Sequence, residues 1–339
     1  MRTLCYNIFT KGFKPALRHA VMVADLKAGS YEHLFVHVCC WGPSPWAWWG
    51  IKIVNMKIGF VGTGFIGGNL SANFLKRGFE DIILYDRSEH AGNKELVCKQ
   101  DITFVAVPTP TLPTGFDSSI LKEVMDLPFK EGAIVVIKST VPPHILREIA
   151  NAHKGKIIMH CPEFLSELTA GEDTDNPDRN IVGISDISDP QLIRKAKDVL
   201  AILPKKSDGT TKEFVCTLEE ASLAKYAGNC FFYVKNVFFN MLYDLASAYD
   251  CNWESLRDMV IGDSRIHPVH TNPVHKGGRG AGNHCLIKDF AAFINMYAVN
   301  KFQDPIGNNI LRDVEKKNIQ LLKSSGKDLD LLEGVYGSL

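Results

Sequence analysis

Short apolar runs alternate with amphipathic stretches through the first two-thirds of the chain. These runs predict six β-strands, at Ile58–Val61, Asp81–Tyr85, Ile102–Val107, Ala133–Ile137, Lys156–Met159 and Asn180–Ile184. Strands that alternate with helices are typical of the α/β class, and they predict a doubly wound, parallel, Rossmann-type sheet. Right-handed crossovers would then place the carboxyl ends of all the strands at one edge, where ligands bind.

Beyond Thr217 the pattern is helical. Thr217 and Glu220 match a capping box, and about thirty residues follow without a proline. A helix of that length spans about 45 Å at ~1.5 Å per residue. Its apolar residues lie nearly all round, which predicts burial between domains or subunits. Three further helices are expected, one starting near Asn252, one following Cys285 and one covering Ile310–Ser324.

These patterns divide the chain into three parts. Residues 56–210 are predicted to form the sheet domain, and residues 211–335 an all-helical domain built on the long helix. Residues 1–55 are an extension that holds four of the five tryptophans, and its apolar run Leu34–Trp41 is too short to span a membrane. Two interpretations of this extension stay open: a non-native or misassigned start, and a genuine extension that docks on another surface.

The composition narrows the function classes. The 339 residues are 45% apolar and 22% charged, as in ordinary globular proteins. A net charge of zero favours neither nucleic acid nor an anionic membrane as a partner. The nine cysteines are scattered without metal-ligand spacing, so we expect no metal site and a reducing, cytoplasmic location.

A glycine-rich turn follows the first strand of the sheet. Gly62, Gly64 and Gly67 form G-x-G-x-x-G between a strand and a helix, which is typical of a dinucleotide-binding turn. Asp86 ends the next strand, where a carboxylate accepts the ribose 2′-hydroxyl and favours NAD over NADP. A merely structural turn is the alternative. The expected cofactor contacts are Gly62, Gly64, Phe65, Ile66, Gly67 and Asp86.

A polar stripe runs along the long helix. Lys225, Asn229, Asn236 and Asn240 are spaced by 4, 7 and 4 residues, so they share one face. Burial of a lysine is costly unless it meets an anion, so Lys225 is a candidate for stabilising a developing oxyanion. The alternatives are that Lys225 extends to solvent and that the two later asparagines only pair helices.

Two glutamates and a threonine follow predicted strands. In CPEFLSEL, Glu163 and Glu167 are four residues apart, so in a helix they would share a face and repel each other. Such repulsion raises a carboxyl pKa and makes a general base, although an exposed helix face is the alternative. Thr140 ends the preceding strand, where its hydroxyl could hold a water or a substrate oxygen.

The run GGRGAGNHCLIKDF carries a candidate nucleophile. Cys285 lies at or just before a predicted helix N-terminus, with Lys288 one turn further on. Both features predict a lowered thiol pKa. Asp289 could pair with Lys225 or Lys288, and a purely structural cysteine is the alternative.

Seven segments, in order along the chain, resemble the UDP-glucose/GDP-mannose dehydrogenase family. They are MKIGFVGTGFIGGNL, DITFVAVPTP, VIKSTVPP, CPEFLSELTAGE, NPDRNIVG, LAKYAGN and RGAGNHCLIKD. The resemblance implies that Cys285 is the nucleophile and that Lys225 and Asn229 stabilise the substrate oxygen. It implies roles in the water and proton network for Asp289 and Thr140.

The resemblance also implies the remaining contacts and the reaction. Glu167 would be the base for thioester hydrolysis, and Glu163 is the acid just before it. Thr109 and Lys288 would lie near the cofactor, and the expected substrate contacts are Phe164, Leu165, Gly280 and Gly282. The implied reaction is the NAD-dependent oxidation of the C6 alcohol of a nucleotide sugar such as UDP-glucose to the uronic acid, through a thiohemiacetal and a thioester, in a homodimer formed by the long helix.

The chain departs from the family pattern at several points. Ala281, Asn283 and Ile287 replace an aromatic residue, a glycine and a proline, and Asn283 stands where a positive φ is expected. Only fourteen residues separate Asp86 from Asp101, and the family's third domain is not seen. Two alternatives therefore stay open: a non-catalytic homologue that binds NAD or dimerises, and a β-hydroxyacid dehydrogenase.

Overall fold

The computed structural model describes residues 6–7, 21–22, 56–300 and 303–338. The chain divides into two compact units, Met1–Met56 and Lys57–Leu339. In the first unit, β1 (Tyr6–Asn7) pairs antiparallel with β2 (Val21–Met22). The predictions for Leu34–Trp41 lie outside the described residues. The second unit is not divided near residue 210, so the boundary expected there stays a prediction.

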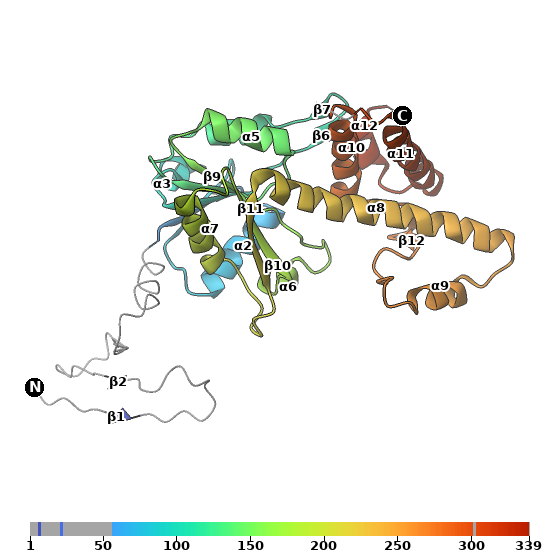
Figure 1. Ribbon diagram of the computed structural model, residues 1–339, viewed down its shortest axis with the longest axis horizontal. Coiled ribbons are helices and arrows are strands. Elements are labelled where there is room, and N and C mark those ends of the chain that lie inside the picture. The colour runs from blue at the N-terminus through green and yellow to red at the C-terminus, as the bar shows by residue number, and fades with distance from the viewer. Residues whose placement is uncertain (1–5, 8–20, 23–55, 301–302, 339) are drawn as a thin grey trace, which may run out of the picture. The chain divides into compact units, whose positions relative to one another are not determined.

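A seven-stranded sheet forms the centre of the second unit (Figure 1). Its order is β11-β10-β9-β8-β5-β3-β4, and the strands from β9 to β4 are parallel. The α/β fold with a mostly parallel Rossmann-type sheet is therefore confirmed. The strand bounds are β3 Ile58–Val61, β4 Ile82–Tyr85, β5 Ile102–Val105, β8 Ile134–Ile137, β9 Ile157–His160, β10 Arg179–Ile184 and β11 Lys212–Thr217.

The prediction that every strand runs in one direction is wrong for the last two. β10 pairs antiparallel with β9, with Gly183 opposite His160, and β11 is parallel to β10. The connection after β9 holds only the short helix α6 (Ala170–Asp175), which packs on α2 (Phe65–Lys76) instead of crossing the sheet. β10 therefore begins, rather than ends, at the ligand edge. β11 was not predicted, because its first three residues are exposed and carry little apolar signal.

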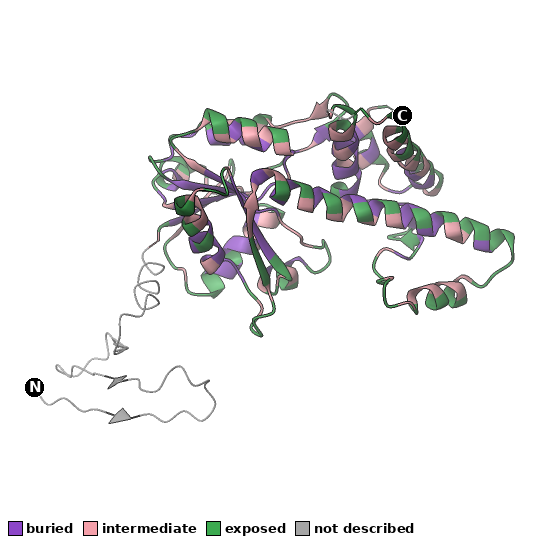
Figure 2. Ribbon diagram, in the orientation of Figure 1, coloured by how far each residue is buried: buried purple, intermediate pink, exposed green. Residues whose placement is uncertain are grey.

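Helices cover the sheet, and its central strands are buried (Figure 2). One core cluster packs side chains of β5 and β8 against Leu121 and Leu146. The covering elements are α3 (Lys94–Val97), α4 (Ser119–Met125), α5 (Pro143–Ala152) and α7 (Pro190–Ile202), with the short helix η1 (Ala91–Asn93). The hairpin β6 (Thr111–Leu112) and β7 (Gly115–Phe116) packs instead on helices α10 (His284–Ala298) and α12 (Leu329–Tyr336).

The long helix α8 (Leu218–Ala248) begins at the expected capping box of Thr217 and Glu220. It runs from the sheet past α10 (His284–Ala298) and α11 (Pro305–Ser325), and Tyr233 stacks on Phe290 at 3.9 Å between ring centroids (Figure 1). The other elements are α9 (Trp253–Ile261), the hairpin β12 (Val274–His275) and β13 (Gly278–Arg279), and α12 (Leu329–Tyr336), which was not predicted.

Burial of α8 is one-sided within the chain. Its opposite face exposes an apolar stripe whose residues recur every three or four positions, at Phe231, Val234, Phe238, Met241 and Leu245. Among the described residues, no helix is both long and apolar enough to cross a membrane.

Candidate functional site

A cavity of about 730 Å³ lies between the segment after β9, one face of α8 and the loop before α10. It brings together residues that are far apart in sequence. The sequence-predicted residues that line it are Glu163, Phe164, Leu165, Glu167, Lys225, Asn229, Gly280, Gly282 and Cys285. Thr140, Thr109, Lys288 and Asp289 lie outside its lining, as does the glycine turn.

Lys225 is a buried cation without an ionic partner. Its residue is only 7% exposed, and its Nζ lies 5.5 Å from the centre of the Phe164 ring. In the described part of the chain, no carboxylate lies within 4.0 Å of Nζ, and it makes no hydrogen bond. Burial lowers the pKa of Lys225, while Asp289 and Cys285 act in the opposite direction. A buried ammonium group that faces a cavity favours an anionic or oxyanionic ligand there.

Lys225 has no ionic partner because both carboxylate oxygens of the nearby Asp289 already have other partners. Asn229 Nδ2 donates to Asp289 Oδ2 at 2.6 Å, and Lys288 Nζ lies 2.5 Å from Asp289 Oδ1. Asp289 itself is 1% exposed. Of the two partners considered for Asp289, Lys288 is therefore the one that pairs with it. The pair also fixes the Asn229 amide beside Lys225 on the cavity wall.

Cys285 opens into the cavity from the first turn of α10. Asn283 caps this helix with a φ of 69°, and its Oδ1 accepts hydrogen bonds from the backbone N–H groups of Cys285 and Leu286, both at 3.1 Å. The prediction of a lowered thiol pKa is wrong. Cys285 is exposed to the cavity, yet its pKa is raised, chiefly by desolvation from the protein that surrounds the cavity and next by Asp289, against the opposing charges of Lys288 and Lys225. The cap also occupies the N–H groups that would have favoured a thiolate.

The two glutamates do not share a helix face, because residues 161–166 are not helical. Glu163 Oε2 lies 2.9 Å from Nζ of Lys138, which is 3% exposed, and Glu167 Oε2 lies 2.7 Å from Nζ of Lys276. Each carboxylate therefore has its own cation, and the expected mutual repulsion is wrong. Although burial opposes it, Cys161 and Glu163 raise the pKa of Lys138.

Thr140 and Thr109 form a pair outside the cavity. The Thr109 hydroxyl donates to the Thr140 carbonyl at 2.9 Å, and Thr109 is buried. This contact ties the end of β5 to the end of β8. It leaves the Thr140 hydroxyl at the carboxyl edge of the sheet, without assigning it a ligand.

The glycine turn has the shape that a dinucleotide needs. Gly62 has a φ of +86°, and an added Cβ would lie 2.3 Å from the Ala106 carbonyl oxygen. A Cβ on Gly67 would lie 1.9 Å from the Gly62 carbonyl oxygen, whereas Gly64 has open space within 4 Å. Phosphate oxygens can therefore approach the backbone at Gly64 and the start of α2. The residues present fit NAD.

The Asp86 side chain is an ionised hydrogen-bond acceptor at the end of β4. The Thr63 hydroxyl donates to Asp86 Oδ2 at 2.5 Å, and the Ser88 N–H donates to Oδ1 at 2.7 Å. The hydrogen bond from Thr63 is the largest of the effects that hold the pKa of Asp86 well below its usual range. The carboxylate is therefore ionised wherever a ribose hydroxyl needs an acceptor.

Four lysine and arginine residues in or beside the cavity escaped the sequence analysis: Lys138, Arg179, Lys276 and Lys327. Arg179 lines the cavity and stacks on Phe164, with 4.1 Å between its Cζ and the ring centre. It reaches the site because β10 begins at the ligand edge, and that depends on its antiparallel pairing. Lys138 carried a signal in the sequence, since it is a lysine that directly follows the apolar strand β8.

Comparisons with known proteins agree with this geometry. Residues 91–199 match the UDP-glucose/GDP-mannose dehydrogenase family, NAD binding domain, and residues 219–319 match that family's central domain. UDP-glucose 6-dehydrogenase of Rickettsia bellii is 29% identical over 233 residues, which are 66% of this chain and 51% of the relative. The chain spans about half the length of the curated relatives it matches.

Two solved structures share the fold. A UDP-glucose dehydrogenase from Pyrobaculum islandicum gives a TM-score of 0.66 at 24% identity and covers 84% of this chain and 72% of its own. The 3-hydroxyisobutyrate dehydrogenase of Mycobacterium tuberculosis gives 0.62 at 18% identity, over 83% of this chain and 98% of its own.

Proposed function

Because the chain belongs to the UDP-glucose/GDP-mannose dehydrogenase family, we propose that it oxidises the C6 alcohol of a nucleotide sugar, UDP-glucose first, to the uronic acid. It carries the family's NAD binding domain. The observation that carries the proposal is the shared cavity of Cys285 and Lys225, in which an unpaired buried ammonium group faces a thiol.

Two oxidations occur at one carbon. NAD, when bound, accepts a hydride in each of them. After the first, the Cys285 sulfur adds to the aldehyde carbon, the C=O double bond becomes single, and the thiol proton is transferred to the aldehyde oxygen, which gives a thiohemiacetal with a carbinol hydrogen. The second oxidation gives a thioester, and water then releases the acid and the thiol. Lys225 and Asn229 stabilise the oxygen as it becomes anionic in these steps.

We propose that carboxylates on the cavity wall assist the hydrolysis of the thioester. We assign water activation to Glu167, with Glu163 beside it and with Asp289 and Thr140 in the supporting proton network. Lys276 holds Glu167 at the cavity wall in the free protein. Phe164, Leu165, Gly280 and Gly282 supply the walls that the sugar contacts.

Counting NADH tests the proposal. UDP-glucose should yield two NADH per sugar oxidised, with no aldehyde released. One NADH per sugar with accumulating aldehyde would contradict the double oxidation. GDP-mannose and UDP-N-acetyl sugars, assayed in parallel, identify the preferred substrate.

Two substitutions of Cys285 test the two alternative functions. A likeness of fold to 3-hydroxyisobutyrate dehydrogenase, over 98% of that structure, supports a β-hydroxyacid dehydrogenase as the second candidate. That chemistry needs a lysine but no thiol, so Cys285→Ser would keep full activity. The third candidate is a homologue that binds NAD without turnover. Measured turnover that disappears in Cys285→Ala would eliminate it.

We also propose that a second copy of the chain covers the apolar stripe of α8, whose central residue Phe238 is 58% exposed. Phe238→Glu should convert a dimer to a monomer in analytical ultracentrifugation. Ser247→Glu, a control at an exposed position near the end of the same helix and on the side away from the stripe, should leave the dimer intact. The described cysteines are free, which supports our proposal of a reducing, cytoplasmic location.

A further inference from the structure

The six residues that lead to Cys285, here called the thiol loop (residues 278–283), are held by the C-terminal helices. Asn318 on α11 is fully buried. Its Oδ1 accepts a hydrogen bond from the Ala281 N–H at 2.6 Å, and its Nδ2 donates to the Ala281 carbonyl at 3.0 Å. One amide side chain thus satisfies both backbone groups of the middle of the loop.

Two residues of the turn between α11 and α12 form hydrogen bonds with the loop on either side of Ala281. Lys327 Nζ donates to the Gly280 carbonyl at 2.9 Å, and the residue is 8% exposed. Asp328 Oδ2 accepts a hydrogen bond from the Asn283 N–H at 2.8 Å. We call Asn318, Lys327 and Asp328 the clamp. All three bind the loop through its backbone, so the contacts fix its path and not its side chains.

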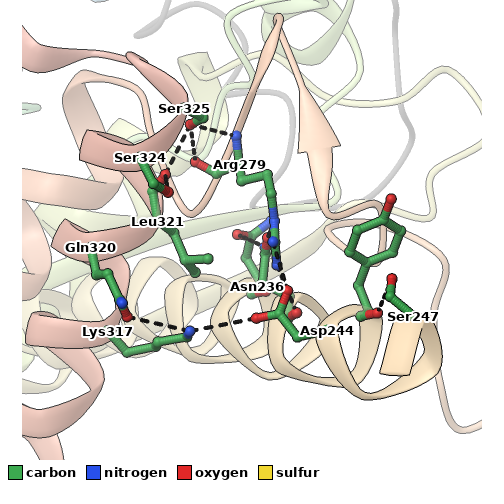
Figure 3. A network of polar contacts seen from close by, with 11 residues as sticks. Asn236, Asp244, Ser247, Arg279, Lys317, Gln320, Leu321, Ser324 and Ser325 are labelled. Carbon is green, nitrogen blue, oxygen red and sulfur yellow. Dashed lines mark hydrogen bonds and ion pairs between the residues drawn. The ribbon is translucent and has the colours of Figure 1, made fainter. Parts of the chain in front are cut away.

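The start of the loop is fixed in the same way (Figure 3). The Arg279 N–H donates to Ser325 Oγ at 2.9 Å. The Arg279 side chain reaches α8, where Nε donates to Asn240 Oδ1 at 3.0 Å and Nη1 lies 2.6 Å from Asp244 Oδ1. The start of the thiol loop is therefore anchored on α11, which packs on α8, and on α8 itself.

The loop needs these anchors because its backbone is unusual. Gly280 has a φ of +93° and Asn283 a φ of +69°, a region that non-glycine residues seldom adopt. A Cβ on Gly282 would lie only 1.9 Å from Asp328 Oδ2. Asn283 is at once the residue held by Asp328 and the cap of α10, so the hydrogen bond that the Asn283 N–H donates to Asp328 helps to set the direction of the helix that carries Cys285.

We propose that Asn318 and Asp328 are positioning residues for the Cys285 thiol. They act through the thiol loop, and they hold the exposed Cys285 side chain at the wall of the cavity that Lys225 also lines. The catalytic part of this inference rests on the proposed function. A displacement of about 1 Å of a reacting group can cost about a hundredfold in rate, so the clamp should matter for turnover although it touches no substrate.

The test compares turnover with alkylation of Cys285 by iodoacetamide, followed over pH by mass spectrometry of its peptide. Cys285 is exposed, so the reagent already reaches it, and the alkylation rate reports the thiol pKa, which desolvation by the surrounding protein raises. In Asp328→Ala the loop should loosen, so the pKa should fall and the alkylation rate near neutral pH should rise about fivefold or more, while turnover falls about tenfold or more. Faster alkylation with slower turnover is a pattern that simple loss of stability does not produce.

Matched variants keep the result interpretable. Asp328→Asn retains an acceptor for the Asn283 N–H and should stay close to wild type in both assays. Asp330→Ala removes an exposed carboxylate two residues away and should also match wild type. Asn318→Ala should repeat the effect of Asp328→Ala. The buried Cys161 and Cys230 report on folding, and both should stay unreactive.

Three results would contradict the proposed role of the clamp. The first is an unchanged alkylation profile in Asp328→Ala, and the second is reaction of Cys161 and Cys230 together with Cys285. The third is faster alkylation with undiminished turnover in an active protein. Failure of the proposed function looks different, since wild type would then oxidise no nucleotide sugar. The alkylation profiles would still decide whether the clamp sets the thiol's environment.

Discussion

Replacement of Lys225 by methionine should stabilise the free protein while it removes most of its turnover. Methionine has a similar length and no charge, so the packing of the buried stem is kept. What disappears is the ammonium group of a residue that is 7% exposed; among the described residues, this group has no carboxylate or hydrogen-bond partner.

The size of the effect follows from burial. An unsatisfied buried polar group costs about 1–3 kcal/mol of stability in protein variants. Relief of that cost should raise the free energy of unfolding by about that amount, and the melting temperature by about 2–6 °C. Loss of one oxyanion donor costs about 10²–10³ in kcat, or roughly 3–4 kcal/mol.

The pH dependence has a definite sign. Burial lowers the pKa of Lys225 from its ordinary value of 10.5. The protonated side chain therefore opposes folding in full below the folded pKa, and this penalty fades as the pH rises from the folded pKa to 10.5. The stability advantage of Lys225→Met should accordingly shrink as the pH rises through that window.

Thermal unfolding tests the predicted gain in stability, and initial rates of NADH formation test the predicted loss of turnover. Lys235→Met, ten residues further along α8 and only partly buried, is the control for the substitution itself. A Lys225→Met protein that is less stable than wild type, or that turns over at the wild-type rate, would refute the assignment of an unpaired cation to this wall.

Three further predictions address other parts of the chain. Asp86→Asn removes an ionised acceptor and should raise the Kd for NAD about tenfold in calorimetry; a wild type that binds NADP as tightly as NAD would contradict that role. Lys138→Met leaves Glu163 without its buried partner and should cost about 3–5 kcal/mol in urea denaturation, with part regained in the double variant with Glu163→Gln. If the single variant were as stable as the double one, the pair would not be a structural contact. Burial lowers the pKa of His160 from 6.5 to about 3, so wild type should lose stability as the pH falls below 6.5, by up to about 1.4 kcal/mol per pH unit. His160→Gln should flatten the dependence of the melting temperature on pH, whereas His144→Gln, at an exposed position, should not.

The sequence by itself determined the local parts of this protein. The glycine turn of Gly62, Gly64 and Gly67 follows from steric rules that act over a few residues, and the structure has no room for a Cβ at the first and last of them. The capping box of Thr217 fixed the start of α8 for the same reason. Apolar periodicity located the five parallel strands of the sheet, since each of them is short and bounded by clear breaks.

Tertiary structure decided what those parts meet, because partners lie far apart in the chain. The spacing of Glu163 and Glu167 predicted repulsion, but in the structure Glu163 pairs with Lys138 and Glu167 pairs with Lys276. A helix start and a nearby lysine predicted an activated thiol at Cys285, but burial outweighs both. No periodicity in the sequence encodes how much water reaches a side chain when several elements close around it.

Arg179 and the clamp escaped the sequence analysis for the same reason: their partners lie far away in the chain. Arg179 enters the site only because β10 pairs antiparallel with β9, and strand direction depends on long-range hydrogen bonds. Asn318 and Asp328 follow Cys285 by more than thirty residues and bind backbone atoms, which have no sequence signature. The amino-acid pattern therefore specified the reactive groups, and the packing of α8, α10 and α11 specified their distances, charges and access to water.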